Sequence, residues 1–342
     1  SMSAAAAADS PVVEDGEHAI YVPPKVNLVQ LDGVAMMQII RHCTENQVAV
    51  DGILLGLDTE KQLEVTHSFP LPSGRDPETG EPVDSEEYQL EMIQRLCDIN
   101  VDHHTVGWYR TSFMGAFDVQ DVVSTQYKFQ ASLGHNVVVL MYDPVLSARG
   151  TLTIKALRLT DAFMAEMADN KFTLQRMSEK RLSAGSIFEE LPVRLANPLL
   201  LQGLVYQLKK QGALGGVASL ASLDLGLGSF LEAQLEVLCE SVDEMAQEQG
   251  RLLQIERQLA RQRALQEQQR QRRLLEGEKR VEFGDELKFV TEPSRLPALL
   301  IGSQIGNYCS LINKFADKAS LKLFAASGLQ EGDRRAGAAT SK

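Results

Sequence analysis

Two continuous apolar runs constrain what this chain can fold into more than any other feature. One covers residues 137–142 and is closed by Asp143 and Pro144, and the other covers residues 52–57 and begins with a glycine. Short apolar runs bounded by turn-forming residues are typical of strands that are buried on both faces of a sheet. Because helices must then cover the sheet, the runs predict an α/β domain.

Helical and strand patterns alternate around these two runs. Residues 63–69 alternate apolar and polar side chains, so we expect them to form a hairpin with residues 52–57 across a turn at 58–61. Further strands are expected at 26–29, 101–109 and 151–159, and helices at 34–46, 88–96 and 117–131. The alternation predicts one mixed α/β domain over residues 26–160.

After residue 160 the strand patterns give way to helical ones, with one candidate extended segment at 189–193. The chain is therefore expected to be an α/β domain followed by an all-α extension. The expected segments are a disordered lead-in at 1–25, the domain at 26–160, connecting helices at 161–228, a long helix at 229–290, a C-terminal helix at 291–327 and a disordered tail at 328–342.

The long helix expected at 229–290 begins with an apolar seam of coiled-coil spacing. Its members alternate spacings of four and three: Leu231, Leu235, Leu238, Val242 and Met245. After Gln249 the seam resumes at Leu252 and continues through Ile255 and Leu259. The seam and the C-terminal helix together carry more apolar surface than one isolated helix can bury. We expect partner helices to cover this surface, and the sequence leaves open whether they belong to this chain or to another.

Charge and cysteine usage narrow the class of protein. The net charge of -12 argues against a protein whose entire surface binds nucleic acid. Residues 251–280 are the exception, with nine Lys or Arg against four Glu, a local charge of +5. They form either an RNA-binding face or a solvated helix face, and the lack of aromatic residues among the arginines favours the second.

No cysteine pair has the spacing of a zinc or redox motif, so the four cysteines are expected to be reduced thiols in a cytoplasmic protein: Cys43, Cys97, Cys239 and Cys309. No apolar run reaches the ~18 residues that a membrane span needs, so no membrane partner is expected.

The stretch Val106-Gly107-Trp108-Tyr109 contains the only tryptophan of the chain. It resembles the V-G-W-Y-H-S-H-P stretch of the MPN family, in which a strand ends and two histidines bind zinc. Aligned on this stretch, the first histidine position holds Arg110 and the second holds Ser112. An arginine stays protonated and cannot donate a lone pair to zinc. Trp108 and Tyr109 are expected to be anchors of the core and of an interface.

The other zinc-site positions of the family are also changed. The serine and aspartate positions fall on Val119 and Val122, Asp121 lies nearby but out of phase, and the glutamate that acts as general base falls on Ala49. The resemblance therefore implies an MPN (JAMM-like) fold without its zinc ligands, a pseudoenzyme. We expect no catalytic residue, no cofactor-binding residue, no metal ligand and no cofactor.

Other residues do not rebuild a site in the sequence. His103 and His104 are adjacent on an expected strand, so their side chains should leave opposite faces. His67 could meet His103 across strands, but no carboxylate accompanies them by spacing. The other histidines are expected on a helix surface, in a loop and in the lead-in: His42, His135 and His18. No nucleophile elbow, phosphate-binding loop or H-E-x-x-H motif is present.

Matches to one metal-free branch of the family extend over residues 26–327 and continue past the domain. They include the segments 101–112, 139–144, 189–193, 242–245 and 299–305. The chain thus resembles the h subunits of eukaryotic translation initiation factor 3. The resemblance implies a non-catalytic scaffold whose MPN domain pairs with the second MPN subunit, f, and whose C-terminal helices join a helical bundle with other subunits.

The same resemblance implies that the complex binds the small ribosomal subunit, with indirect contact to mRNA or rRNA. It further implies roles in mRNA recruitment, scanning and reinitiation. Two other functions stay open at this point. One is a zinc metalloprotease of deubiquitinase type with unaligned ligands, and the other is a subunit of a different MPN-containing complex.

Overall fold

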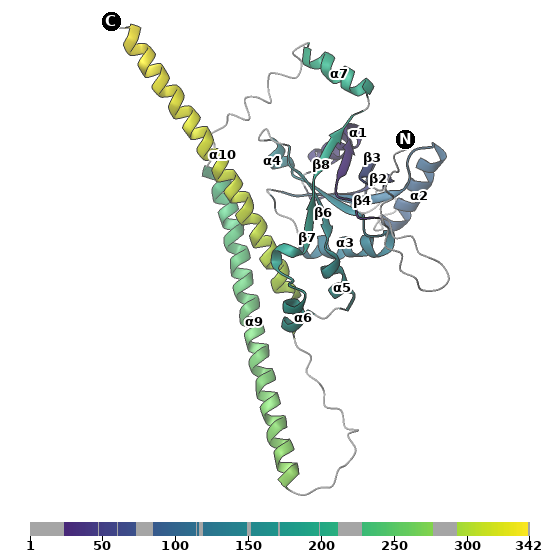
Figure 1. The fold of residues 1–342 in the computed structure, drawn as a ribbon, viewed down its shortest axis with the longest axis vertical. Coiled ribbons are helices and arrows are strands. Elements are labelled where there is room, and N and C mark those ends of the chain that lie inside the picture. The colour runs from purple at the N-terminus through teal and green to yellow at the C-terminus, as the bar shows by residue number, and fades with distance from the viewer. Residues whose placement is uncertain are drawn as a thin grey trace, which may run out of the picture.

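The computed structural model describes residues 24–340, apart from 47, 60, 73–84, 114, 116–118, 149–151, 170–171, 198, 211–227 and 276–292. An eight-stranded mixed sheet carries helices on both faces, and two long helices form an arm beside it (Figure 1). The expected mixed α/β domain and the long C-terminal helices are therefore both present.

The sheet has the strand order β7-β6-β5-β4-β2-β3-β1-β8. Its strands are β1 (Val29–Asp32), β2 (Asp51–Asp58), β3 (Leu63–Pro70), β4 (Thr105–Thr111), β5 (Val138–Tyr142), β6 (Ile154–Leu159), β7 (Phe188–Leu191) and β8 (Val193–Ala196). β2 and β3 form the predicted hairpin, and β2 also pairs antiparallel with β4. β2 and β5 are interior strands, which explains their continuous apolar sequences.

One extended segment joins the two ends of this strand order. Only Pro192 separates β7 from β8, yet β7 pairs with β6 and β8 pairs with β1 at the other end of the sheet. The Pro192 carbonyl accepts a hydrogen bond from the backbone N–H of Val29 at 3.0 Å. The sheet therefore curls and closes through residues 188–196. The extended segment that the sequence suggests at 189–193 is thus part of the sheet, which continues beyond residue 160.

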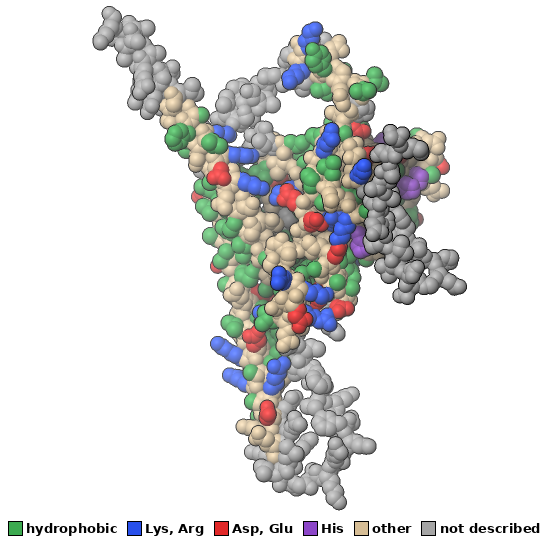
Figure 2. Space-filling model, in the orientation of Figure 1, with side chains coloured by type: hydrophobic (Ala, Val, Ile, Leu, Met, Phe, Trp, Pro, Cys, Tyr) green, Lys and Arg blue, Asp and Glu red, His purple; other side chains and the backbone are tan. Residues whose placement is uncertain are grey.

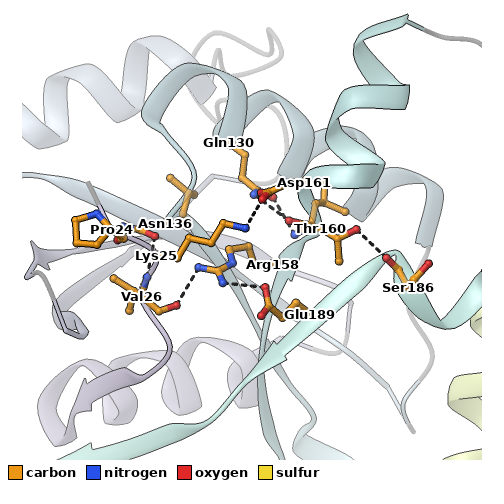
Figure 3. Close-up of polar contacts among 12 residues, drawn as sticks. Pro24, Lys25, Val26, Gln130, Asn136, Arg158, Thr160, Asp161, Ser186 and Glu189 are labelled. Atoms are coloured by element: carbon orange, nitrogen blue, oxygen red, sulfur yellow. Dashed lines mark hydrogen bonds and ion pairs between the residues drawn. The ribbon is translucent and has the colours of Figure 1, made fainter. Parts of the chain in front are cut away.

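A polar cluster fastens the place where the sheet closes (Figure 3). The buried Arg158 of β6 donates from Nη1 to the carbonyl of Val26 at 3.0 Å and from Nη2 to Glu189 Oε2 of β7 at 2.8 Å. Asn136 accepts from the Val26 N–H at 3.1 Å and donates to the Pro24 carbonyl at 3.0 Å. Because these contacts reach backbone atoms, they fix the path of the chain into β1.

Side chains of the central strands alternate between the two faces of the sheet. Leu54 and Tyr109 pack on one face with the first helix, and Ile53 and Trp108 pack on the other face with the next two. These helices are α1 (Gly33–Glu45), α2 (Ser85–Asp98) and α3 (Val119–Leu133). The layers are therefore helix, sheet and helix, as the paired apolar runs predict.

The arm is an antiparallel pair of long helices. The remaining helices are α4 (Pro144–Ala148), α5 (Asp161–Asp169), α6 (Leu174–Glu179), the 3-10 turn η1 (Ala184–Ser186), α7 (Leu199–Lys210), α9 (Gly228–Leu275) and α10 (Leu296–Thr340). Phe230 and Phe315 touch with ring centroids 4.4 Å apart, and Arg295 pairs with Glu256 toward the other end. Within the described residues, no helix combines the length and the hydropathy that crossing a bilayer requires.

Helix α10 also packs against the sheet domain. Leu299 and Leu300 are buried with Phe163 of α5 and with Ile187, which immediately precedes β7. The arm is thus fixed to the domain through the N-terminal end of α10. α10 continues as a helix to Thr340, whereas the sequence predicts a disordered tail from residue 328. The lead-in before residue 24 and the segment 276–290 of the expected long helix lie outside the described residues.

The face of α9 that α10 covers includes only part of the predicted seam. The buried residues of α9 are Phe230, Gln234, Ser241, Leu252 and Leu259. Leu235 and Val242 of the predicted seam are 44% and 48% exposed. The later seam members Leu252 and Leu259 thus lie on the covered face, whereas Leu235 and Val242 lie beside it.

Candidate functional site

Trp108 anchors the middle of β4 to helix α3. Its indole is buried against the ring of Phe129, with the ring centroids 6.1 Å apart. Its Nε1 donates to Gln126 Oε1 at 2.7 Å, and Gln126 Nε2 donates to the Val137 carbonyl at 2.8 Å. The amide thereby satisfies two buried polar groups, and Trp108 has the predicted role of a core anchor.

Tyr109 has the corresponding role on the opposite face of the sheet. It is buried, and its hydroxyl lies 2.9 Å from His42 Nδ1 of α1. His42 is thus a half-buried partner of the core rather than a free surface histidine. Burial raises the pKa of Tyr109, so the phenol stays protonated at neutral pH.

Arg110 occupies the first histidine position, and its guanidinium lies between two carboxylates. Arg110 Nε is 2.9 Å from Asp51 Oδ1, and Nη2 is 2.6 Å from Asp121 Oδ2. Asp51 is directly opposite Arg110 in the register of β2 and β4, and Asp121 comes from the first turn of α3. The Arg110 Cζ atom is also 5.8 Å from the centre of the Trp108 ring, within the range of a cation–π contact.

The electrostatics of this trio oppose a bound cation. Burial lowers the pKa of Arg110, but the charges of Asp51 and Asp121 outweigh burial, so the pKa of Arg110 is raised. Burial raises the pKa of Asp51, and the nearby guanidinium limits that rise. Both carboxylates are engaged by a permanent positive charge, which would repel a metal ion at the same place.

Ser112, at the second histidine position, is part of the core. Its backbone N–H donates to the Tyr142 carbonyl of β5 at 2.8 Å, and its side chain is buried. The neighbouring Asp143 accepts hydrogen bonds from the N–H groups of Gly115 at 2.6 Å and Leu146 at 2.9 Å. Burial raises the pKa of Asp143, and the hydrogen bonds from Leu146, Val145, Gly115 and Ser112 oppose that rise. The carboxylate therefore holds a loop.

Helix α10 packs over this loop. Gly115 has a φ of 75°, and a Cβ atom at that position would lie 2.9 Å from Leu311 Cδ2 of α10. A cavity of about 490 Å³ remains between the loop and the helix, and Ser112, Asp143, Gly302 and Ser303 belong to its lining. The end of β4, where the aligned zinc-ligand positions lie, therefore faces a helix of the same chain.

The other aligned positions do not fit zinc. Val119 and Val122 are buried apolar residues of α3, and Ala49 is exposed before β2. Zinc takes imidazole, thiolate and carboxylate ligands, whereas these positions offer a guanidinium, a hydroxyl and alkyl groups. In the part of the chain that the structure describes, no group of three or more His, Cys, Asp or Glu residues could hold a metal ion.

The positions of His103 and His104 differ from the prediction. β4 begins at Thr105, so both residues precede the strand, and their rings lie 4.5 Å apart instead of on opposite faces. His67 Nδ1 is 3.1 Å from Thr66 Oγ1 of its own strand. His135 lies in the turn after α3, as expected, and His18 is outside the described residues.

Asp51 is a site residue that its own sequence pattern does not single out, although Gly52 beside it carries a signal. Gly52 pairs with Tyr109, and a Cβ atom at Gly52 would overlap the Tyr109 ring. Only a glycine at position 52 lets the Tyr109 ring approach β2 so closely, so Gly52 is a signal for this pairing. Pairing Gly52 with Tyr109 places Asp51 opposite Arg110. The sequence patterns do not show that β2 pairs with β4 as well as with β3.

Comparisons with known proteins agree with this structure. Residues 24–133 match the family described as JAB1/Mov34/MPN/PAD-1 ubiquitin protease, and residues 147–335 match the family described as the C-terminal region of eIF3h. The chain belongs to the eIF3h family, the H subunits of eukaryotic translation initiation factor 3. The resemblance seen in the sequence is therefore confirmed.

Relatives named as the H subunit of this factor match almost end to end. The chain is 34% identical to that of Nematostella vectensis over 322 residues, which are 90% of this chain and 95% of the relative. It is 33% identical to that of Dictyostelium discoideum over 327 residues, 94% of this chain and 99% of the relative. It is 34% identical to that of Arabidopsis thaliana over 322 residues, 91% of this chain and 95% of the relative.

Membership of the eIF3h family covers both the sheet domain and the arm. The match to the C-terminal region begins at residue 147 and includes β7 and β8, which close the sheet. The family is thus shown by residues that build the sheet as well as by those that form the arm.

Proposed function

We propose that this chain is a non-catalytic scaffold subunit of the translation initiation factor 3 complex. The observation that carries this proposal is the trio of Arg110, Asp51 and Asp121, which places a paired guanidinium at the first zinc-ligand position. A water molecule is activated in such sites by a metal with an open coordination position, and these residues provide neither ligands nor a base for it.

The proposed partners follow from family membership and from the apolar surface of the helices. The MPN domain pairs with the second MPN subunit, f, and α9 and α10 join helices of other subunits. The assembly acts in the cytoplasm on the small ribosomal subunit, in mRNA recruitment, scanning and reinitiation. Exposed apolar residues support the helical contacts, including Leu235 and Val242 on α9 and Leu321 and Phe324 on α10.

Direct RNA binding by α9 receives less support. Arg257, Arg261 and Arg263 are exposed, but a helix turns by about 100° per residue, so Arg257 and Arg263 point in well-separated directions. A basic face that follows a phosphate backbone needs its charges on one side. The arginines therefore fit the solvated outer surface of a bundle.

The absence of catalysis is tested by metal analysis and an isopeptidase assay. Purified wild-type protein and the variant Arg110→His/Ser112→His are dialysed with zinc, and bound zinc and cleavage of a ubiquitin chain are measured. We expect less than stoichiometric zinc and no cleavage for both, because Ala49 and Val122 still lack the base and the third ligand. Stoichiometric zinc with cleavage by the wild type would overturn the proposal.

The scaffold role is tested by affinity purification of the tagged full chain and mass spectrometry of what co-purifies. Initiation factor 3 subunits are expected with the wild type and should be lost with Leu235→Asp/Leu238→Asp/Val242→Asp. The control Gln247→Asp/Gln254→Asp adds charge at exposed positions of the same helix and should keep the partners. Recovery of a different MPN-containing complex, or full retention by the seam variant, would contradict this role.

A further inference from the structure

Helix α9 carries a second apolar stripe that neither α10 nor the sheet domain covers. Its members have spacings of four, three and four, and all are exposed: Leu235, Cys239, Val242 and Ala246. Leu231 and Leu238 border it and are half-buried. Figure 2 shows hydrophobic side chains on the outside of the two long helices, where they meet solvent. A helix with two stripes is typical of a bundle of three or more helices.

Acidic residues border this stripe on one side. At about 100° per residue, the stripe is followed around the helix by the exposed Glu232, Asp243, Glu236 and Glu240, in that order. On its other side the stripe adjoins the face packed against α10, where Gln234 and Leu252 are buried. The stripe is therefore an apolar surface that is bordered by helix α10 on one side and by a row of carboxylates on the other.

The charge of α9 divides near its middle. Residues 228–250 contain six acidic residues and no basic one, whereas residues 251–275 contain seven Arg and two Glu. The exposed apolar stripe lies in the acidic part. A second copy of α9 lying antiparallel would match the charges. It would, however, set the apolar stripe against the polar half of its copy, so it does not explain the stripe.

We propose that this acidic-flanked stripe binds a basic amphipathic helix of a partner subunit, with Lys or Arg on the side that faces Glu232 and Glu236. The inference rests on the proposed scaffold function and specifies the chemistry of the partner. Opposite charges beside a coiled-coil seam select the partner and its register, and like charges there exclude wrong partners. The apolar surface supplies affinity, and the carboxylates supply selectivity.

The test uses the tagged full chain within its assembly. Glu232→Lys/Glu236→Lys reverses two carboxylates of the flank, and the matched control Arg257→Glu/Arg261→Glu reverses two exposed charges of the same helix outside the stripe. We expect the flank variant to retain about tenfold less of the partner at about 150 mM salt, as repulsion replaces attraction. The control should stay within about twofold of the wild type.

A cross-link identifies the helix that is bound. In a Cys97→Ser/Cys309→Ser background, a benzophenone maleimide is attached to the exposed Cys239 at the centre of the stripe. The cross-linked peptide should come from another subunit, carry net positive charge and have apolar residues three and four apart. An acidic peptide, a peptide from a second copy of this chain, or equal retention by the flank variant and its control would overturn the inference. Failure of the wild type to co-purify with initiation factor 3 subunits would instead overturn the proposed function.

Discussion

Replacing Arg110 by alanine should destabilise the sheet domain, and the structure allows the cost to be worked out. The Arg110 side chain is 15% exposed, and its partners Asp51 and Asp121 are 35% and 52% exposed. The solvated pair with Asp121 contributes up to about 1 kcal/mol. Leaving the half-buried Asp51 carboxylate unpaired costs about 1.5 kcal/mol. Loss of the contact with Trp108 adds about 0.5 kcal/mol.

The expected total is therefore about 3 kcal/mol for Arg110→Ala, and a urea titration followed by tryptophan fluorescence measures it. Trp108 is the only tryptophan, and it is buried in the sheet domain, so its emission reports on this domain and not on the arm. With a urea dependence of about 2 kcal/mol/M, the midpoint should fall by about 1.5 M.

Two controls separate this explanation from a general loss of stability. Arg95→Ala removes an exposed pair with Glu91 on α2 and should cost less than about 0.5 kcal/mol. In the Arg110→Ala background, Asp51→Asn removes the unpaired charge and should recover about 1 kcal/mol. If Arg110→Ala behaves like Arg95→Ala, the trio does not hold β2, β4 and α3 together, and the reasoning fails.

The stability that Arg110→Ala loses should also depend on pH, and the structure predicts the direction of that dependence. Burial raises the pKa of Asp51, and removing Arg110 takes away the charge that opposes this rise. A carboxyl whose pKa is raised in the folded state stabilises the fold below its ordinary pKa, and that contribution is lost as pH rises through the folded value. The deficit of Arg110→Ala should therefore shrink as pH falls from about 7 toward about 4.5, and a growing deficit would contradict the assignment.

Three further predictions use other parts of the fold. A chain that ends at residue 160 should be mostly insoluble, because β1 and β6 lose the segment that pairs with both. A chain that ends at residue 196 keeps this segment and should show the fluorescence emission of a buried tryptophan. Equal solubility of the two chains would argue against closure of the sheet by residues 188–196. Burial raises the pKa of Cys43 to about 11, so alkylation at about pH 8 followed by mass spectrometry should label the three exposed cysteines and spare Cys43 until urea is added. The stabilisation by that thiol is complete below its ordinary pKa of 9.0 and is lost as pH rises through about 11. Gln126→Leu leaves the Trp108 indole N–H and the Val137 carbonyl without their partner and should cost about 3 kcal/mol in the same urea titration, with a cost below about 1 kcal/mol counting against the buried amide.

Much of the fold follows from local patterns in the sequence. The hairpin of β2 and β3, the buried run of β5 and the helices α1, α2 and α3 are predicted, because a strand or helix is indicated by its own periodicity. The replacement of the zinc ligands by Arg110 and Ser112 is equally local, since it depends only on residue identity at aligned positions.

The parts that escape prediction depend on which elements become neighbours. Asp51 meets Arg110 because β2 pairs with β4, a non-local choice that periodicity does not encode. The sequence indicates an extended segment at 189–193, but β7 and β8 are short and polar on exposed faces, so their pattern does not show that they pair at both ends of the sheet. The predicted seam of α9 is covered at Leu252 and Leu259 and exposed at Leu235 and Val242, and only packing against α10 decides which members are covered.

The segment that closes the sheet also sets an order of events during synthesis. Val29 of the first strand pairs with Val193, so β1 leaves the ribosome long before its partner exists. Until then β1 and β6 present unpaired edges, which are the surfaces that most readily associate with other chains. Closure over such a sequence separation is slow compared with helix or hairpin formation. A nascent chain of this family therefore stays an unfinished sheet through the synthesis of most of its domain, and a chaperone or an early-bound partner at those edges would be most useful in that interval.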